Sequence, residues 1–187
     1  PAVAVLDVAS DGGTIEVVGA DVDAVQVDAH VSEGLVETVF THDVVGDRLQ
    51  VRVRCKGVVV NMWCSADLKI VVPRDLEVKL RADHDRITVR GLDGRVDAAS
   101  DNGTVEAEGL SGATILRSSN GPVRAARLRT DSIQADSDNG SVRLEFETPP
   151  LSAIAHSDNG SVEVSLPKGD EAYAVDVRSG NGSTDNL

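Results

Sequence analysis

Aromatic residues are scarce in this chain: Phe40, Trp63, Phe146 and Tyr173 make up 2% of its 187 residues. Proteins that bind single-stranded nucleic acid stack the bases on several exposed rings, and sugar-binding sites commonly use rings in a similar way. So few rings cannot build a stacking platform for nucleic acid. They also disfavour carbohydrate binding.

Basic residues are outnumbered as well, 18 against 31 acidic residues, which gives a net charge of -13. Such an acidic field repels nucleic acid and anionic lipid. There is no apolar run of about 18 residues, so we predict no membrane insertion by this segment. No charged-then-apolar leader follows Pro1, and both ends look like cut points. We therefore expect any signal peptide or membrane anchor to lie outside this chain.

Motifs for cofactors, metals and catalysis are also missing. The sequence has no Gly-rich phosphate-binding motif, and His30, His42 and His84 lack the spacing of zinc ligands. His156-Ser157-Asp158 contains the residue types of a catalytic triad, but neighbours along a strand point in different directions. We therefore expect no cofactor, no metal site and no catalytic residues, and hence a protein that is not an enzyme.

One group of residues keeps an enzyme hypothesis open. Arg124, Arg127 and Arg129, with Asp131 or Asp136 nearby, would flank an acidic substrate in a carbohydrate-active β-helix protein. This hypothesis rests on analogy between folds alone. The same residues are typical of an exposed edge of mixed charge, which is the interpretation we favour.

The segment Asp136-Ser137-Asp138-Asn139-Gly140 begins like a calcium-binding loop, but its Gly stands one position too early. The pattern is typical of solvated turns, so we predict no structural calcium. A row of Asp101, Asp138 and Asp158 along one edge would gather divalent ions only loosely.

Five Asn-Gly pairs recur in the second half of the chain, with steps of 18, 19, 20 and 22 residues between the asparagines. A nearly fixed period of this length is typical of repeat architectures, in which each unit buries its apolar face by stacking on its neighbours. The pairs are Asn102-Gly103, Asn120-Gly121, Asn139-Gly140, Asn159-Gly160 and Asn181-Gly182.

Apolar residues follow a shorter rhythm between these pairs. Period-two alternation with β-branched residues, as in residues 49–55 and 68–72, predicts half-buried strands, and no stretch shows a helical period. From residue 87 onward, a large apolar residue recurs every 8 to 10 positions, at Ile87, Val96, Val105, Ile115, Val123, Ile133 and Val142.

Two all-β arrangements fit this rhythm. Asn-Gly is a strong hairpin signal, so an antiparallel meander or sandwich is one alternative. We favour a parallel β-solenoid, because Asn-Gly turns alternate with Leu-x-Gly turns at Leu92-Asp93-Gly94 and Leu110-Ser111-Gly112. Stacked coils place like turns above one another, so the asparagines would form a hydrogen-bonded ladder. Each Gly would then adopt a left-handed conformation at its corner.

The chain reads as one continuous domain with two parts. Residues 1–80 contain strands of varied length, and we predict that they cap the repeats, because the end of a solenoid must be protected from edge-to-edge pairing. Residues 81–187 contain the repeats.

The stretch from Leu68 to Val78, with Val72-Pro73 in its middle, precedes a train of Ser-x-Asn-Gly-x-Val units. These units are Ser100–Val105, Ser118–Val123, Ser137–Val142 and Ser157–Val162. Over residues 10–185 this pattern resembles the bacterial "putative adhesin" domain of unknown function, a family of β-strand repeats. The resemblance implies a β-helix-like fold and a place in the cell envelope or outside the cell. The family supplies no catalytic residues, and Asp83–Ile87 departs from the pattern because it lacks the Gly.

The two cysteines, Cys55 and Cys64, both fall in alternating patterns from which their thiols can point inward. The extracellular setting that the resemblance implies favours a disulfide between them. The alternative is two separate buried free thiols in a cytosolic protein.

These observations favour a non-catalytic, adhesin-like scaffold or protein-binding module of the cell envelope or extracellular space. The partner that we expect is a protein, or a second copy of this chain. Two alternatives are a carbohydrate-active or carbohydrate-binding β-helix protein, and a solenoid that assembles end to end through its C-terminal coils.

Overall fold

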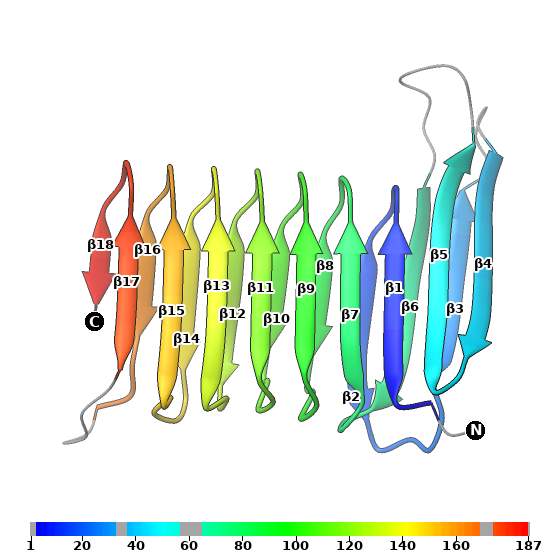
Figure 1. Cartoon of the computed structure of the whole chain (residues 1–187), viewed down its shortest axis with the longest axis horizontal. Helices are drawn as coiled ribbons and strands as arrows, with labels where there is room; N and C mark the ends of the chain where they lie inside the picture. Colours follow the sequence, from blue (N-terminus) through cyan, green and yellow to red (C-terminus); the bar gives the residue numbers. More distant parts are fainter. Residues whose placement is uncertain (1–2, 33–36, 57–64, 169–173, 187) are drawn as a thin grey trace.

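The computed structural model describes residues 3–32, 37–56, 65–168 and 174–186, and these residues form two nine-stranded sheets without helices (Figure 1). The first sheet, in spatial order, contains β17 (Val175–Ser179), β15 (Ser152–Ser157), β13 (Ser132–Ser137), β11 (Thr114–Ser118), β9 (Val96–Ser100), β7 (Glu77–Ala82), β1 (Val5–Ser10), β5 (Arg48–Lys56) and β4 (Glu37–Val45). The second contains β18 (Thr184–Asn186), β16 (Val162–Ser165), β14 (Val142–Phe146), β12 (Val123–Leu128), β10 (Val105–Glu108), β8 (Ile87–Arg90), β2 (Ile15–Ala20), β6 (Ser65–Pro73) and β3 (Gln26–Ser32).

From β7 onward, successive strands alternate between the two sheets, so each pair of strands makes one coil (Figure 1). Every strand pairing between β7 and β18 is parallel. The all-β prediction is therefore confirmed. The alternative of an antiparallel meander is wrong for this part of the chain, because strands of neighbouring coils stack in register instead of turning back on each other.

The N-terminal coil of β1 and β2 lies inside the stack. β1 pairs in parallel with β7 on one side and with β5 on the other, and β2 lies in the same way between β8 and β6. Among the described strands, only β3 and β4 pair antiparallel, at the edges next to β6 and β5. Both sheets thus continue across residue 80, and only the outermost pair of strands departs from the parallel arrangement.

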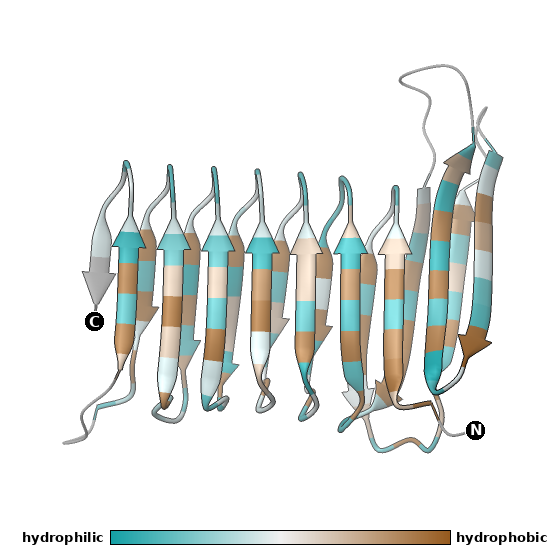
Figure 2. Cartoon of the chain, in the orientation of Figure 1, coloured by the Kyte–Doolittle hydropathy of each residue, from teal (hydrophilic) through white to brown (hydrophobic). Residues whose placement is uncertain are grey.

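The core is the single layer of side chains between the two sheets. Inward and outward residues alternate along each strand, which Figure 2 shows as alternating hydrophobic and hydrophilic bands. Six of the seven recurrent apolar residues predicted for the core are buried: Ile87, Val96, Val105, Val123, Ile133 and Val142.

The prediction is wrong for Ile115, whose neighbours Thr114 and Leu116 are the buried residues of β11. Thr114 can point inward because its hydroxyl donates to the carbonyl of Gly112 at 2.9 Å, which satisfies its polar atom. The larger apolar side chain of Ile115 is therefore left on the outer face.

The Asn-Gly corners need Gly for a reason other than the predicted one. Among the described glycines, those with positive φ are Gly13, Gly46, Gly91 and Gly109, so the expectation of left-handed Asn-Gly corners is wrong. Successive corners instead approach very closely. A Cβ atom on Gly140 would overlap the backbone carbonyl of Gly121 in the coil before it. The corner thus requires the absence of a side chain.

Candidate functional site

The outer face of the second sheet is hollowed into a groove of about 230 Å³ that crosses β8, β10, β12 and β14. The outward-facing Ala126 lies in this groove, and the buried Ala107 and Ala125 also line it. Charged side chains surround them, and we call the whole feature the Arg-Glu groove; its charged residues are Arg90, Glu106, Glu108, Arg124, Arg143 and Glu145.

The parallel register explains how these side chains gather. Glu106 of β10 pairs with Arg124 of β12, and Arg124 pairs with Arg143 of β14, so these three residues form a row across the strands. In the next row, Glu108 pairs with Ala126. A short side chain in a row of long ones leaves the hollow, because residues paired across parallel strands lie on the same face.

A β-bulge in β12 shapes one side of the groove. The pairing of β12 with β14 shifts between Ala125 and Leu128, so β12 holds one residue more than its partner in this interval. Arg127 occupies the bulge with a φ of 52°, the one positive φ among the described non-Gly residues. Such conformations are uncommon for residues other than Gly, and bulges are frequent where a side chain is redirected. Arg127 reaches sideways to Glu108 of β10.

Ion pairs organise the charged side chains of the groove. Arg90 Nη1 lies 2.6 Å from Glu16 Oε1, Arg124 Nη1 lies 3.7 Å from Glu106 Oε1, and Arg143 Nη2 lies 2.6 Å from Glu163 Oε2. The side chains of Arg124 and Arg143 remain 51% and 63% exposed. Because exposed pairs contribute little stability, these guanidinium groups can exchange their partners at low cost.

A second hollow of about 320 Å³ adjoins the Arg-Glu groove and shares Arg90 and Glu108 with it. Gly19, Gly91 and Gly109 line it together with further charged residues, among them Arg129 and Glu147. The two hollows therefore form one charged depression along the second sheet.

The residues of the enzyme hypothesis do not gather at one site. Arg124, Arg127 and Arg129 lie along the charged depression. Asp136 lies on β13 of the first sheet, where its carboxylate accepts a hydrogen bond from Gln134, and Asp131 immediately precedes that strand. The arginines therefore have glutamates as their neighbours.

Arg90, Glu106, Glu108 and Arg143 were not among the residues predicted from the sequence. The pattern that identifies them is the recurrence of charged residues at outward positions one coil apart, such as Glu106, Arg124 and Arg143. That spacing can be recognised only once the register of the coils is known.

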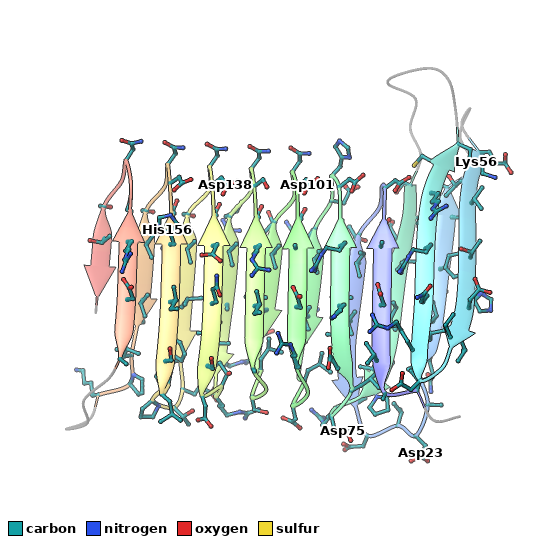
Figure 3. All side chains as sticks on the ribbon, viewed as in Figure 1. Asp23, Lys56, Asp75, Asp101, Asp138 and His156 are labelled. Carbon is teal, nitrogen blue, oxygen red and sulfur yellow. The ribbon has the colours of Figure 1, made fainter. Side chains whose placement is uncertain are left out.

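His156 contacts Asp158, with 2.9 Å between Nε2 and Oδ1, so the prediction that these side chains diverge is wrong for this pair. His156 lies on β15, toward the edge where the Asn-Gly turns stand (Figure 3). Ser157 points into the core instead, where its Oγ donates to the carbonyl of Gly140 at 2.8 Å. These three residues therefore do not form a nucleophilic relay.

At the edge of the Asn-Gly turns, the asparagine side chains form a continuous ladder, which we call the Asn ladder. Each Nδ2 donates to the Oδ1 of the asparagine one coil before it. The distances are 2.9 Å for Asn120 to Asn102, 2.9 Å for Asn139 to Asn120, 3.0 Å for Asn159 to Asn139 and 2.9 Å for Asn181 to Asn159. An amide can both donate and accept, so it can continue such a ladder in both directions.

In three of these turns, a buried serine accepts a hydrogen bond from the backbone N–H of the Gly. The backbone N–H of Gly140 donates to Ser137 Oγ at 2.9 Å, and Ser137 Oγ donates to the carbonyl of Gly121 at 2.9 Å. Ser118 makes the equivalent pair of bonds with Gly121 and Gly103. Ser100 likewise accepts from the N–H of Gly103. We call this acceptance of the glycine N–H the Ser clamp. The hydrogen bonds that Ser118 and Ser137 donate in turn link their turns to the coil before them.

Acidic side chains also lie along this edge, where Asp101 and Asp138 are labelled in Figure 3. Partial burial and the nearby carboxylates of Asp11 and Asp101 raise the pKa of Asp83 above its ordinary value, and His84 opposes the shift. In the part of the chain that the structure describes, no cluster of His, Cys, Asp and Glu could hold a metal ion.

The raised pKa of Asp83 predicts a pH-dependent gain in stability for Asp83→Asn. The native state holds the proton more tightly than the unfolded state, so stability falls as pH rises from the ordinary carboxyl pKa of about 4 through the raised value. We expect Asp83→Asn to increase Tm at neutral pH and to leave it unchanged below that window.

Thermal unfolding followed by circular dichroism at both pH values tests this, with Asp23→Asn at an exposed position as the control. An equal gain for Asp83→Asn at low pH would mean that the charge of Asp83 is not the cause.

Cys55 carries a disulfide, whereas Cys64 lies outside the described residues. Their pairing therefore stays a prediction. If it is correct, the intact mass of the chain increases by about 2 Da on reduction, because one S–S bond is replaced by two S–H groups. An unchanged mass would contradict the pairing of Cys55 with Cys64 within one chain.

Comparisons with known proteins point to a fold and not to an activity. No family model matches this chain, and its sequence matches no curated protein. The structure is similar to the crystal structure of a "putative cell adhesion protein" from Clostridium sporogenes ATCC 15579, with a TM-score of 0.56 and 11% identity. The match covers 97% of this chain and 91% of that one. The two proteins thus share an all-β fold over nearly their whole lengths.

Within the described ranges, no helix has the length and apolar character needed to cross a membrane.

Proposed function

We propose that this chain is a β-solenoid that serves as a non-catalytic, adhesin-like protein-binding module in the cell envelope or outside the cell. The observation that carries the proposal is the Arg-Glu groove. It offers half-exposed guanidinium groups around the small side chain of Ala126, across four strands. The shared fold with a protein described as adhesive supports the same function.

The chemistry of the groove favours a protein partner. Arginine is enriched at protein interfaces, because its planar group can bind carboxylates and carbonyl oxygens through two hydrogen bonds. Among the described residues that line the groove, none is aromatic, which disfavours sugars. The net charge of -13 disfavours nucleic acid. The groove itself carries both signs of charge, so a polypeptide with acidic and basic side chains is its expected ligand.

Charge reversal in the groove tests this function. In the double variant Arg124→Glu/Arg143→Glu, each substitution replaces a positive charge by a negative one, so the net charge of the groove becomes more negative by four. A matched control, Arg81→Glu/Arg117→Glu, makes the same change on the first sheet, where these side chains are 46% and 45% exposed. Circular dichroism would establish that both variants fold.

The readout is cross-linking of each purified variant to the surface proteins of intact cells. We expect the wild-type chain and the control to capture the same surface protein, and the groove variant to bind it about tenfold more weakly, which corresponds to about 1.4 kcal/mol. Equal capture by the groove variant would exclude the groove as the binding site. Capture of a polysaccharide instead of a protein would contradict the proposed ligand class.

A further inference from the structure

The Asn-Gly pairs are sites of potential deamidation, and this fold opposes the reaction at some of them. In any Asn-Gly sequence, the Gly backbone nitrogen can attack the Asn side-chain carbon Cγ. The new N–Cγ bond forms as the Cγ–Nδ2 bond breaks, the side-chain nitrogen leaves as ammonia, and a succinimide ring remains. Water then opens the ring to aspartate or isoaspartate. Gly favours the reaction because no Cβ hinders the approach of its nitrogen.

Two sets of hydrogen bonds oppose this reaction in the middle coils. At Asn139-Gly140, the attacking N–H donates to the buried Ser137 Oγ at 2.9 Å, which directs it into the core. The Asn139 amide is held in the opposite direction by the Asn ladder, where it donates to Asn120 and accepts from Asn159. Asn120-Gly121 is restrained in the same two ways, with Ser118 as its clamp.

The last Asn-Gly pair lacks most of these restraints. Asn181 donates to Asn159 Oδ1 at 2.9 Å, but among the described residues none donates to Asn181 Oδ1. Ser179 Oγ donates to the carbonyl of Gly160, yet it does not accept a hydrogen bond from the N–H of Gly182. Both Asn181 and Gly182 are exposed. The nucleophile and the carbon that it attacks are therefore freer to meet.

We propose that Asn181 is the site at which the folded chain deamidates, and that the Ser clamp together with the Asn ladder protects Asn120 and Asn139. The product adds a negative charge and a carboxylate, which can accept hydrogen bonds but not donate them. The bond from residue 181 to Asn159 Oδ1 is then lost.

Asn159 separates the contributions of the two restraints. Its amide is held on both sides, by Asn139 and Asn181, but Gly160 makes no hydrogen bond to Ser157 Oγ. Asn159 therefore has the ladder without the clamp. We expect it to react faster than Asn120 and Asn139 but more slowly than Asn181.

The experiment is incubation of the folded chain in mildly alkaline buffer, followed by peptide mapping with mass spectrometry. We expect Asn181 to react about tenfold or more faster than Asn120 and Asn139; tenfold corresponds to about 1.4 kcal/mol, the size of one net hydrogen bond. In denaturant, the differences among the five pairs should largely disappear. Equal rates for Asn181 and Asn139 in the folded chain would overturn the proposal.

A variant of Ser137 tests the Ser clamp at an inner coil. Its effect is therefore separate from the greater opening of terminal strands. In folded Ser137→Ala, the rate at Asn139 is expected to rise about tenfold, since one hydrogen bond is lost, while Asn120 keeps its clamp and its rate. An unchanged rate at Asn139 would show that the clamp does not protect it. If the variant does not fold, Asn159 in the wild-type chain decides the question, because a rate as low as that of Asn120 would overturn the role of the clamp.

Discussion

Replacement of Gly140 by Ala is expected to lower the free energy of unfolding by about 3 kcal/mol or more. The added Cβ would overlap the carbonyl oxygen and carbon of Gly121, and it would also lie 2.8 Å from the nitrogen of Pro122. These are backbone atoms of a stacked coil, so no side chain can rotate away to make room. The overlap can be relieved only if the two coils move apart, which weakens the parallel pairing of β12 with β14.

Urea unfolding followed by far-ultraviolet circular dichroism measures this effect. The matched control is Gly46→Asn, because nothing lies within 4 Å of a Cβ at Gly46 and Asn tolerates its φ of 66°. We expect the control to change stability by less than about 1 kcal/mol. If Gly140→Ala is as stable as the control, close stacking of the corners is not the reason for the repeated Gly.

Removal of the Ser137 hydroxyl is expected to cost about 2 to 4 kcal/mol, because Ser137→Ala leaves two buried backbone groups without partners. These groups are the N–H of Gly140 and the carbonyl of Gly121, which Ser137 Oγ joins through two hydrogen bonds of 2.9 Å. Ser137 is only 1% exposed, so water cannot readily replace the hydroxyl. The same unfolding measurement gives the magnitude.

Ser119→Ala is the control for this variant, since Ser119 occupies the turn at a half-exposed position and its hydroxyl bonds no described residue. A loss of similar size for both variants would indicate a general preference for Ser in the turns. A loss confined to Ser137→Ala would establish the link between coils as the source of the stability.

The two predictions concern one structural unit. The Ser-x-Asn-Gly turn places an amide on the outside, a hydroxyl on the inside and a bare backbone at the corner, and each of the three contacts the coil before it. Stability in such a stack is approximately a sum over coils and their interfaces. A change in one turn therefore weakens its interface with the coil before it.

Much of this architecture could be predicted from local pattern. Alternation of apolar and polar residues identifies strands, and the spacing of the Asn-Gly pairs indicates a repeat near twenty residues. The alternation of turn types favoured parallel stacking over a meander, and the observed pairing of β7 to β18 is parallel. These features depend on neighbours in the sequence, so the sequence contains them directly.

Other features depend on which strands become neighbours in space, and only the tertiary structure decided them. The insertion of β1 between β5 and β7 joins residues more than 40 positions apart, and no local pattern records that choice. The corner Gly residues were predicted to adopt a left-handed conformation, but the close approach of the neighbouring coil is what requires the missing Cβ.

The Arg-Glu groove likewise depends on which strands become neighbours in space. The sequence by itself determined which residues of each strand can face outward, because side chains alternate along a strand. It did not determine that Glu106, Arg124 and Arg143 would form one row, or that a bulge would direct Arg127 toward Glu108. Those contacts arise from the register between coils, which is set when the whole core packs and not by any single segment.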